Sequence, residues 1–359
     1  MCSNRMIKRI FSKTELLVLK NGLIIFVVLF AGLNINAYAC EGCSFVHEPT
    51  VQIAMLWRNG IAQGLSYEKG NATARSVFIF GDDVFVTGMK RNEQGNWVAT
   101  LWINGTAQSL SDGRHNAEAF SVFVSDGDIF VVGSEENEQG NWVATLWING
   151  VAQHLSDGNY STWADSVFVS EGNVFVAGIE LNLQKTNKNV VILWKNGIAQ
   201  RLSDGIRWAN ANSVFVSGDD VFVAGREIDE QGRHFAILWK NGIAQRLSDG
   251  SSNKEAYSLY VFGNNVFVVG TGATLWKNGT AQHMSDGINA QFNSIFVSVT
   301  GDVFVAGREQ SEQGNWVATL WRNGVPHHLS DGTNVAVALS IFVSASGDTF
   351  VVGHERKYF

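Results

Sequence analysis

The sequence has little proline, little cysteine and little charge. Of 359 residues, two are proline, three are cysteine and 16% are charged, whereas 45% are hydrophobic and 11% are aromatic. A chain that stays disordered has the opposite balance, with few aromatic residues and much charge. The composition therefore predicts a folded protein with a substantial core.

An excess of basic residues is also absent. Lys and Arg together number 26 against 33 Asp and Glu, which gives a net charge of −7. Five of the basic residues and only one acidic residue, Glu15, lie within residues 1–39, so a chain without that segment would be more acidic still. Such a surface repels the phosphate backbone of nucleic acids. We therefore expect no nucleic-acid partner.

Residues 1–39 have the pattern of an export signal. Basic residues precede an apolar stretch over 23–33, which is followed by Ala37-Tyr38-Ala39. The apolar stretch would make only ~16 Å of helix, which is shorter than the ~30 Å core of a bilayer. We predict a cleaved signal peptide over 1–39, with an uncleaved anchor as the alternative. The protein would then be secreted, periplasmic or held at a bacterial cell surface.

Two cysteines follow the expected cleavage site, in residues 40–50, which we interpret as a short linker. Cys40 and Cys43 form a C-x-x-C pair that could be a local disulfide or, less in keeping with a lone pair, a redox or metal site. Cys40 could instead carry a lipid. We expect membrane contact only through such a lipid or through an uncleaved anchor.

The remaining chain repeats one phrase of about 45 residues. The motif Leu-Trp-x-Asn-Gly occurs seven times, with its tryptophans spaced by 45, 45, 47, 45, 37 and 45 residues. A period of this length indicates one supersecondary unit per repeat, stacked on its neighbours. The tryptophans, which we expect in the core together with the Phe of each Val-Phe-Val run, are Trp57, Trp102, Trp147, Trp194, Trp239, Trp276 and Trp321.

Each repeat predicts four antiparallel strands, which we name a to d. In the repeat that begins at Ser121, two runs rich in Val and Phe flank a turn at 125–127, and 142–147 and 151–155 flank an Asn-Gly pair typical of a type I′ turn. A four-stranded unit of this length is the blade of a β-propeller. We predict a seven-bladed all-β propeller over residues 51–359.

The phase of the strands predicts how the ring closes. The repeated region begins at Gln52 with strand c and ends after strand b at Gly353. The last blade would then combine N-terminal strands c and d with C-terminal strands a and b, which hides exposed sheet edges.

Six Ser-Asp-Gly turns resemble calcium ligands in residue type only. Each Asp stands alone beside a glycine, as an Asx-turn requires, whereas calcium needs several converging oxygens. We therefore expect no metal and no cofactor. These aspartates are Asp112, Asp157, Asp204, Asp249, Asp286 and Asp331.

Positions that break the repeat are our candidates for a ligand site. The residue before the repeated Ser of strand a varies while its surroundings stay nearly constant, and strand a should be innermost, so these residues would surround the mouth of the central channel. Five further aromatic or polar residues break the repeat in the d–a segments. The candidates are Arg75, Phe120, Asp165, Asn212, Tyr257, Asn293 and Leu339, with Tyr160, Trp163, Arg207, Trp208 and His115 beside them.

The phrases at Leu193–Gly205 and Ser213–Gly225 resemble repeats of uncharacterised secreted bacterial proteins. The resemblance covers about Gln52 to Gly353 and implies a propeller, but it implies no activity and no site residues. The Gly-His and Trp-Asp pairing of WD repeats is absent.

Three functions stay open. No H-E-x-x-H, G-x-S-x-G, P-loop or G-x-G-x-x-G context occurs, and the Glu that recurs after strand b, as at Glu135 and Glu180, is too repetitive for one special role. We therefore predict no catalytic residue and a monomeric scaffold that binds a protein or a glycan on the face of the b–c and d–a loops. The alternatives are a glycan-active hydrolase or lyase at the channel mouth and a structural role in surface assembly.

Overall fold

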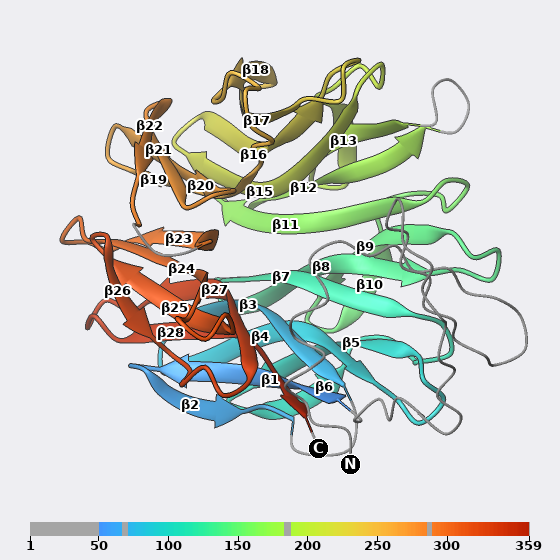
Figure 1. Cartoon of the computed structure of the whole chain (residues 1–359). Helices are drawn as coiled ribbons and strands as arrows, with labels where there is room; N and C mark the ends of the chain where they lie inside the picture. Colours follow the sequence, from blue (N-terminus) through green and yellow to red (C-terminus); the bar gives the residue numbers. More distant parts are fainter. Residues whose placement is uncertain (1–49, 67–70, 183–187, 286–288, 359) are drawn as a thin grey trace, which may run out of the picture. The chain divides into compact units, whose positions relative to one another are not determined.

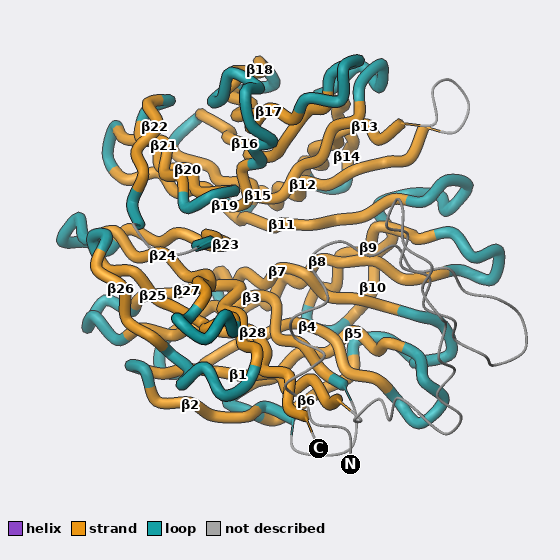
Figure 2. Tube along the Cα trace, in the orientation of Figure 1, coloured by secondary structure: helices purple, strands orange, loops and turns teal. Residues whose placement is uncertain are grey.

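A computed structural model describes residues 50–358, apart from 67–70, 183–187 and 286–288. Cys40, Cys43 and the expected signal peptide lie outside these residues. The chain forms two units, residues 1–48 and residues 49–359, and only the second is described below. In the described ranges the regular structure is entirely β-strand, as Figure 2 shows.

The strands fall into four sets of seven. Strands a are β3 (Ala72–Phe80), β7 (Ala117–Ser125), β11 (Thr162–Ser170), β15 (Trp208–Ser217), β19 (Ala256–Phe262), β23 (Gln291–Val297) and β27 (Val335–Val343). Strands b are β4 (Asp83–Arg91), β8 (Asp128–Glu136), β12 (Asn173–Asn182), β16 (Asp220–Ile228), β20 (Asn265–Gly270), β24 (Val303–Gln310) and β28 (Thr349–Tyr358).

The two outer sets are strands c and strands d, and each strand d has only four residues. Strands c are β1 (Thr50–Arg58), β5 (Trp97–Ile103), β9 (Trp142–Ile148), β13 (Lys188–Lys195), β17 (His234–Lys240), β21 (Thr274–Lys277) and β25 (Trp316–Arg322). Strands d are β2 (Ile61–Gly64), β6 (Thr106–Ser109), β10 (Val151–His154), β14 (Ile198–Arg201), β18 (Ile243–Arg246), β22 (Thr280–His283) and β26 (Val325–His328).

These strands form seven separate four-stranded sheets in the described part of the chain. Six sheets follow chain order, and we number them blade 1 (β3–β6) to blade 6 (β23–β26). Each strand a contacts the strand a of the next blade, and β27 contacts β3, so the inner strands close into a ring. The fold is a seven-bladed β-propeller, as the repeat predicts.

Blade 7 joins the two ends of the repeated region. Its order is β2-β1-β28-β27, and β1 pairs with β28 from Thr50 opposite Tyr358 to Arg58 opposite Phe350. Figure 1 shows β1, in blue, beside β28, in red. The predicted closure is therefore confirmed. Two strands from each end complete one sheet, and the pairing of β1 with β28 covers the edge that each pair would otherwise expose.

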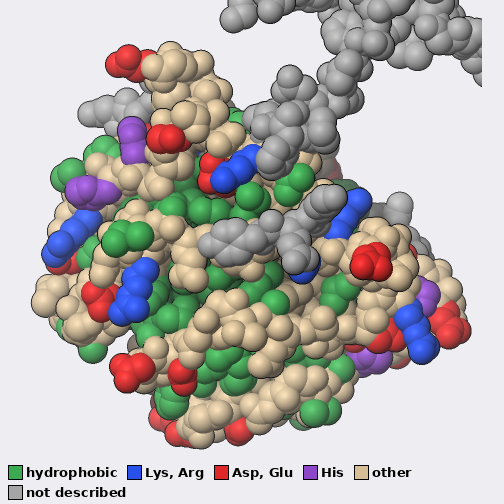
Figure 3. Space-filling model, turned by 90° about the horizontal axis from the view of Figure 1, so that it is seen from below, with side chains coloured by type: hydrophobic (Ala, Val, Ile, Leu, Met, Phe, Trp, Pro, Cys, Tyr) green, Lys and Arg blue, Asp and Glu red, His purple; other side chains and the backbone are tan. Residues whose placement is uncertain are grey.

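The core lies between blades. All seven repeated tryptophans are at most 2% exposed, and each packs from strand c against the preceding blade, as Trp194 does against Phe130 and Val132 of blade 2. Burying such a side chain stabilises the fold by roughly 1.5–3 kcal/mol. The Asn-Gly turns adopt the predicted conformation, with Asn59 at φ 50° and Gly60 at φ 80°. In Figure 3, hydrophobic side chains gather in the middle of the face shown and charged ones lie nearer its margin.

Candidate functional site

Each strand a carries a β-bulge, and its extra residue is the one that varies between repeats. In blade 1 the pairing of β3 with β4 passes from Ala74 directly to Ser76, which leaves Arg75 unpaired. The glycine of strand b permits this close approach, because a Cβ on Gly88 would lie 1.9 Å from the carbonyl oxygen of Thr73. The other six bulges occur at the same repeat position.

The seven bulged residues line one cavity of about 280 Å³ at the mouth of the central channel. The register of every inner strand thus directs its variable residue to the same place. The cavity is lined by Arg75, Phe120, Asp165, Asn212, Tyr257, Asn293 and Leu339. Their location is a structural fact, whereas ligand binding by them stays a prediction.

A ring of serine hydroxyls fixes the inner strands to one another next to the cavity. Ser76 Oγ accepts a hydrogen bond from the Val122 N–H of the next blade at 3.3 Å, and Ser340 Oγ accepts one from Val77 N–H at 3.3 Å, which closes the circle. The remaining five bonds measure 3.1 to 3.3 Å. The repeated Ser therefore holds the bulges in register around the axis.

Further along the inner strands, seven aromatic rings form a second closed circle. Their centroids are 4.6 to 5.1 Å apart, and neighbouring planes differ by 43° to 58°. A regular heptagon of this side places each ring centre about 5.6 Å from the axis, and rings so close must turn their edges inward. We expected the Phe of each Val-Phe-Val run in the core. This is only partly right, because the seven rings of this circle are half-buried. They are Phe78, Phe123, Phe168, Phe215, Tyr260, Phe296 and Phe342.

Two carboxylic acids border one side of the cavity. Burial raises the pKa of the Asp165 carboxyl from 3.8 to about 7; Arg75 opposes this rise and Glu118 adds to it. Burial likewise raises the pKa of Glu118, which Arg75 again opposes. Neither carboxyl forms a hydrogen bond or an ion pair with another described residue. Asp165 is therefore an available acid whose protonation changes near neutral pH.

Arg75 lines the same cavity near these acids, and further basic groups lie near it. Arg75 lies with its guanidinium carbon 5.6 Å from the centre of the Phe120 ring, and burial lowers its pKa. Burial, together with the charges of Arg75, Arg356 and Arg308, lowers the pKa of His354 from 6.5 to about 4. His354 is therefore a neutral imidazole at neutral pH, with three arginines nearby.

Some candidate residues are already engaged by the next blade. Asn212 Nδ2 donates to Ala256 O at 2.8 Å and to Glu255 Oε1 at 3.0 Å, and Asn293 Nδ2 donates to Ala338 O at 2.8 Å. These two amides therefore link adjacent blades as well as lining the cavity.

A second cavity of about 430 Å³ adjoins the first, which we call the tryptophan groove. It contains both tryptophans that depart from the repeat, Trp163 and the 40% exposed Trp208, and it shares Asp165 and Asn212 with the channel mouth. Its other lining residues are Ile179, Leu181, Asn189, Asn210 and Ala211. Tyr160 and Arg207 do not line either cavity, and Arg207 instead lies 3.9 Å from Glu227.

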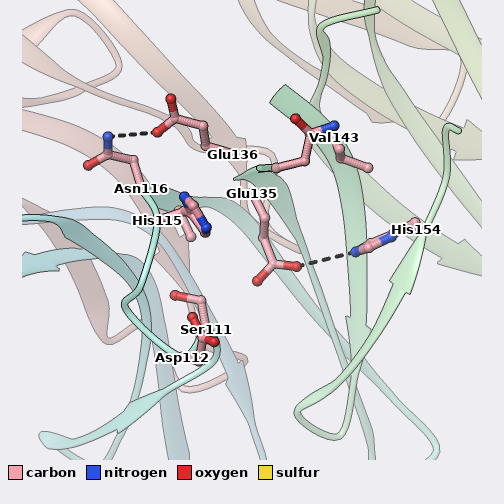
Figure 4. Close-up of a pocket in the computed structure, with 10 residues that line it drawn as sticks. Ser111, Asp112, His115, Asn116, Glu135, Glu136, Val143 and His154 are labelled. Carbon is pink, nitrogen blue, oxygen red and sulfur yellow. Dashed lines mark hydrogen bonds and ion pairs between the residues drawn. The ribbon is translucent and has the colours of Figure 1, made fainter. Parts of the chain in front are cut away.

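A third cavity, of about 210 Å³, lies between blades 1 and 2 (Figure 4). Glu135 and His154 point toward each other across it at 3.6 Å, and His115 and Asp112 also line it. The same pair recurs as Glu309 with His328 at 2.8 Å, as the recurrence of this Glu in the sequence indicates. We interpret it as a repeated link between strands b and d.

No cluster suited to a metal occurs among the residues that the structure describes. The Asp of the Ser-Asp-Gly turns accepts a backbone N–H two residues later, as from Asn159 to Asp157 Oδ1 at 3.0 Å, which is the Asx-turn expected. Asp286 lies outside the described residues. The described ranges also contain no helix long and apolar enough to cross a bilayer.

Comparisons with known proteins show the fold and nothing finer. No protein-family model matches the chain, and no curated protein does. Among solved structures, a putative TolB from Agrobacterium tumefaciens is similar, with 12% identity over 87% of this chain and 99% of that one and a TM-score of 0.46.

A puromycin-hydrolysing peptidase from Mycobacterium tuberculosis is also similar. It has 11% identity and a TM-score of 0.51 over 77% of this chain, which spans about half (52%) of the peptidase. At such identities the likeness concerns architecture alone.

Proposed function

We propose that the protein is a non-catalytic binding scaffold that holds a glycan at the channel mouth and in the adjoining tryptophan groove. The observation that carries this proposal is that the residues which break the sevenfold repeat meet in two cavities joined through Asp165 and Asn212. A purely structural ring has no need for six residue types among seven equivalent positions.

The size of the cavities favours a glycan over a protein. Small-ligand sites measure roughly 300–1,000 Å³, and the tryptophan groove, at about 430 Å³, falls in that range. A protein partner would need an interface of ~800 Å² on each side. Trp208 offers an exposed aromatic face for a sugar ring, and Asn189, Asn210 and Asp165 offer hydrogen-bonding groups for hydroxyls.

The location that we propose is outside the cytoplasm of a bacterium. The support for it is the export pattern of residues 1–39, with Cys40 as the residue that would carry a lipid if the protein is anchored. Protein secreted or exposed at the cell surface would meet glycans there. The intact mass of the exported chain would distinguish simple cleavage from acylation and would report the state of Cys40 and Cys43.

A glycan array with the full mature chain tests the binding proposal. Trp208→Ala should weaken every hit about tenfold, because stacking on an aromatic ring is worth ~1–1.5 kcal/mol. Phe80→Ala is the matched control, since Phe80 is an exposed aromatic residue (45%) at the opposite end of strand a. An array without hits, or hits that Phe80→Ala and Trp208→Ala weaken equally, would contradict the proposal.

One observation supports a second candidate, a glycan-active hydrolase or lyase. A carboxyl group with a pKa of about 7 beside another carboxylate is what general acid catalysis uses. Asp165→Asn would then abolish turnover of a bound glycan while leaving its affinity within a few fold. Absence of product from every bound glycan with the unmodified protein would reject this candidate and leave the binding scaffold.

A further inference from the structure

Charged groups of both signs lie around Arg75 at the channel mouth. Arg308 of β24, His354 of β28 and Arg75 of β3 belong to three consecutive blades, and Arg75 and Arg308 both act electrostatically on His354. Glu118 of β7 and Asp165 of β11 belong to the next two blades. A ligand at this mouth therefore meets basic groups on one side of Arg75, which we call the basic side, and acidic groups on the other.

The basic side has donors that the protein does not use. Arg75 forms no ion pair or hydrogen bond in the described part of the chain, and its Nε is buried without a partner. His354 Nδ1 is likewise buried without a partner. Buried polar atoms in native structures are nearly always bonded, so two unpartnered atoms on side chains that interact with each other, one of which lines the cavity, call for an explanation.

Arg308 is held in position beside them. Its Nε donates to Gln291 Oε1 at 3.0 Å, and its guanidinium carbon lies 4.1 Å from the centre of the Trp316 ring. These contacts fix the plane of the guanidinium while its terminal N–H groups stay available. The side chain is thus oriented before any ligand arrives.

Arg226 occupies the same repeat position as Arg308, directly after the strand b glycine, but it behaves differently. Arg226 donates to Glu255 Oε2 at 2.8 Å, so its charge is neutralised within the protein. Arg75 and Arg308 have no such carboxylate partner among the described residues. Arg75 interacts with Glu118 and Asp165 only at longer range, so its guanidinium, like that of Arg308, is not held in a direct ion pair.

We propose that the glycan bound here is an acidic oligosaccharide, in which the carboxylate of one sugar unit binds between Arg75, Arg308 and His354 while a neighbouring unit stacks in the tryptophan groove. This inference rests on the glycan binding proposed above and specifies its ligand class. Because the groove belongs to blades 3 and 4 and the arginines to blades 6 and 1, the proposed ligand is a chain of a few units and not a single sugar.

The surroundings favour a single carboxylate over a highly charged group. The planar fork of Arg matches a carboxylate with two parallel hydrogen bonds. Glu118 and Asp165 near Arg75, together with the net charge of −7, oppose a ligand with many negative charges. Sulfated and phosphorylated sugars are therefore outcomes of the test and not part of the proposal.

The test is an array of uronate-bearing, sialylated, sulfated, phosphorylated and neutral oligosaccharides, applied to the full mature chain. We expect hits confined to the carboxylate-bearing sugars. Hits on neutral sugars alone would overturn the acidic ligand and leave the glycan-binding scaffold standing. Hits on sulfated or phosphorylated sugars alone would overturn the carboxylate. No hits at all would overturn the proposed function and this inference together.

Variants then locate the carboxylate. For the strongest hit and its methyl ester, Arg75→Gln should reduce affinity for the acid by about tenfold or more and leave the ester nearly unchanged, because a charge-assisted hydrogen bond is lost. Trp208→Ala should weaken acid and ester equally. Arg308→Gln should act like Arg75→Gln, which keeps the test valid if one variant folds poorly.

The matched control is Arg322→Gln. It removes the same charge at the opposite end of blade 6, where Arg322 Nη2 lies 2.7 Å from Asp302. If Arg322→Gln lowers the preference for acid over ester as much as Arg75→Gln does, the effect is long-range electrostatics and the proposed carboxylate site is wrong.

Discussion

Asp165 should make the folded protein less stable as the pH rises. The pKa of its carboxyl is raised from 3.8 to about 7 in the folded state, so the folded protein binds this proton more tightly than the unfolded chain does. Below about pH 4 both states hold the proton and the group contributes nothing. Between about pH 4 and pH 7 the unfolded state gains from ionisation first, and stability falls.

The magnitude follows from the size of the shift. Each pKa unit corresponds to ~1.4 kcal/mol, so Asp165 lowers the free energy of unfolding by up to about 4 kcal/mol at pH 8. Water in the cavity solvates the part-exposed carboxylate and reduces this figure. Asp165→Asn removes the charge at nearly constant shape. The variant should match the unmodified protein at pH 4 and exceed its stability by up to about 4 kcal/mol at pH 8.

Urea unfolding followed by tryptophan fluorescence from pH 4 to pH 8 measures this difference. Two other groups titrate in the same range: Glu118, whose pKa is also raised, and His354, whose lowered pKa makes stability rise between about pH 4 and 6.5. Both are present in variant and parent, so the difference largely cancels them. A difference that stays constant from pH 4 to pH 8 would refute the reasoning.

Asp331→Asn serves as a control of opposite sign. Hydrogen bonds from Thr333 lower the pKa of this exposed carboxyl. The carboxylate form therefore stabilises the fold above the unfolded pKa, and this contribution is lost as the pH falls. Relative to the parent, Asp331→Asn should be less stable at pH 8 than at pH 3, which is the reverse of the trend for Asp165→Asn.

Three further predictions concern the ring itself. Deleting residues 340–359 removes β28 and the end of β27, so β1 and β2 lose their inner partner. Circular dichroism should then show no single cooperative thermal transition, which we expect of the full chain. Gly178→Ala should destabilise by several kcal/mol and lower the melting temperature sharply, since the new Cβ would lie 2.0 Å from the Trp163 carbonyl oxygen. Glu135→Gln should change the free energy of unfolding by less than about 1 kcal/mol and leave glycan affinity unchanged, because its partner His154 is largely exposed.

The architecture could be predicted from the sequence because it depends on features that repeat. The tryptophan period gives the blade, and the phase of the strands at Gln52 and Gly353 gives the closure. The positions of the seven variable residues followed from their place before the repeated Ser. The repeat itself supplied seven comparisons at each position, which a single copy of a fold does not offer.

The site was only partly predictable. Arg308 and His354 follow the strand b glycine and Glu118 precedes the bulge by two residues, and these positions also vary between repeats. Their approach to the mouth depends on the bulge, which alters the direction of side chains. The strand b glycine is consistent with a bulge, but it does not say where the neighbouring side chains then point. Tyr160 and Arg207 were expected at the site from their loops, but the path of a loop depends on tertiary contacts, and neither lines the cavities.

If the ligand proposed above is part of a long polysaccharide, the circle of seven aromatic rings decides how that polymer can be held. With ring centres about 5.6 Å from the axis and edges turned inward, the opening that remains is too small for a sugar ring to pass. The propeller is then a cup and not a tube, so a polymer cannot be threaded through it. A ligand must enter and leave by the same opening, and a long chain can be gripped at its tip or along its flank but cannot be travelled along processively.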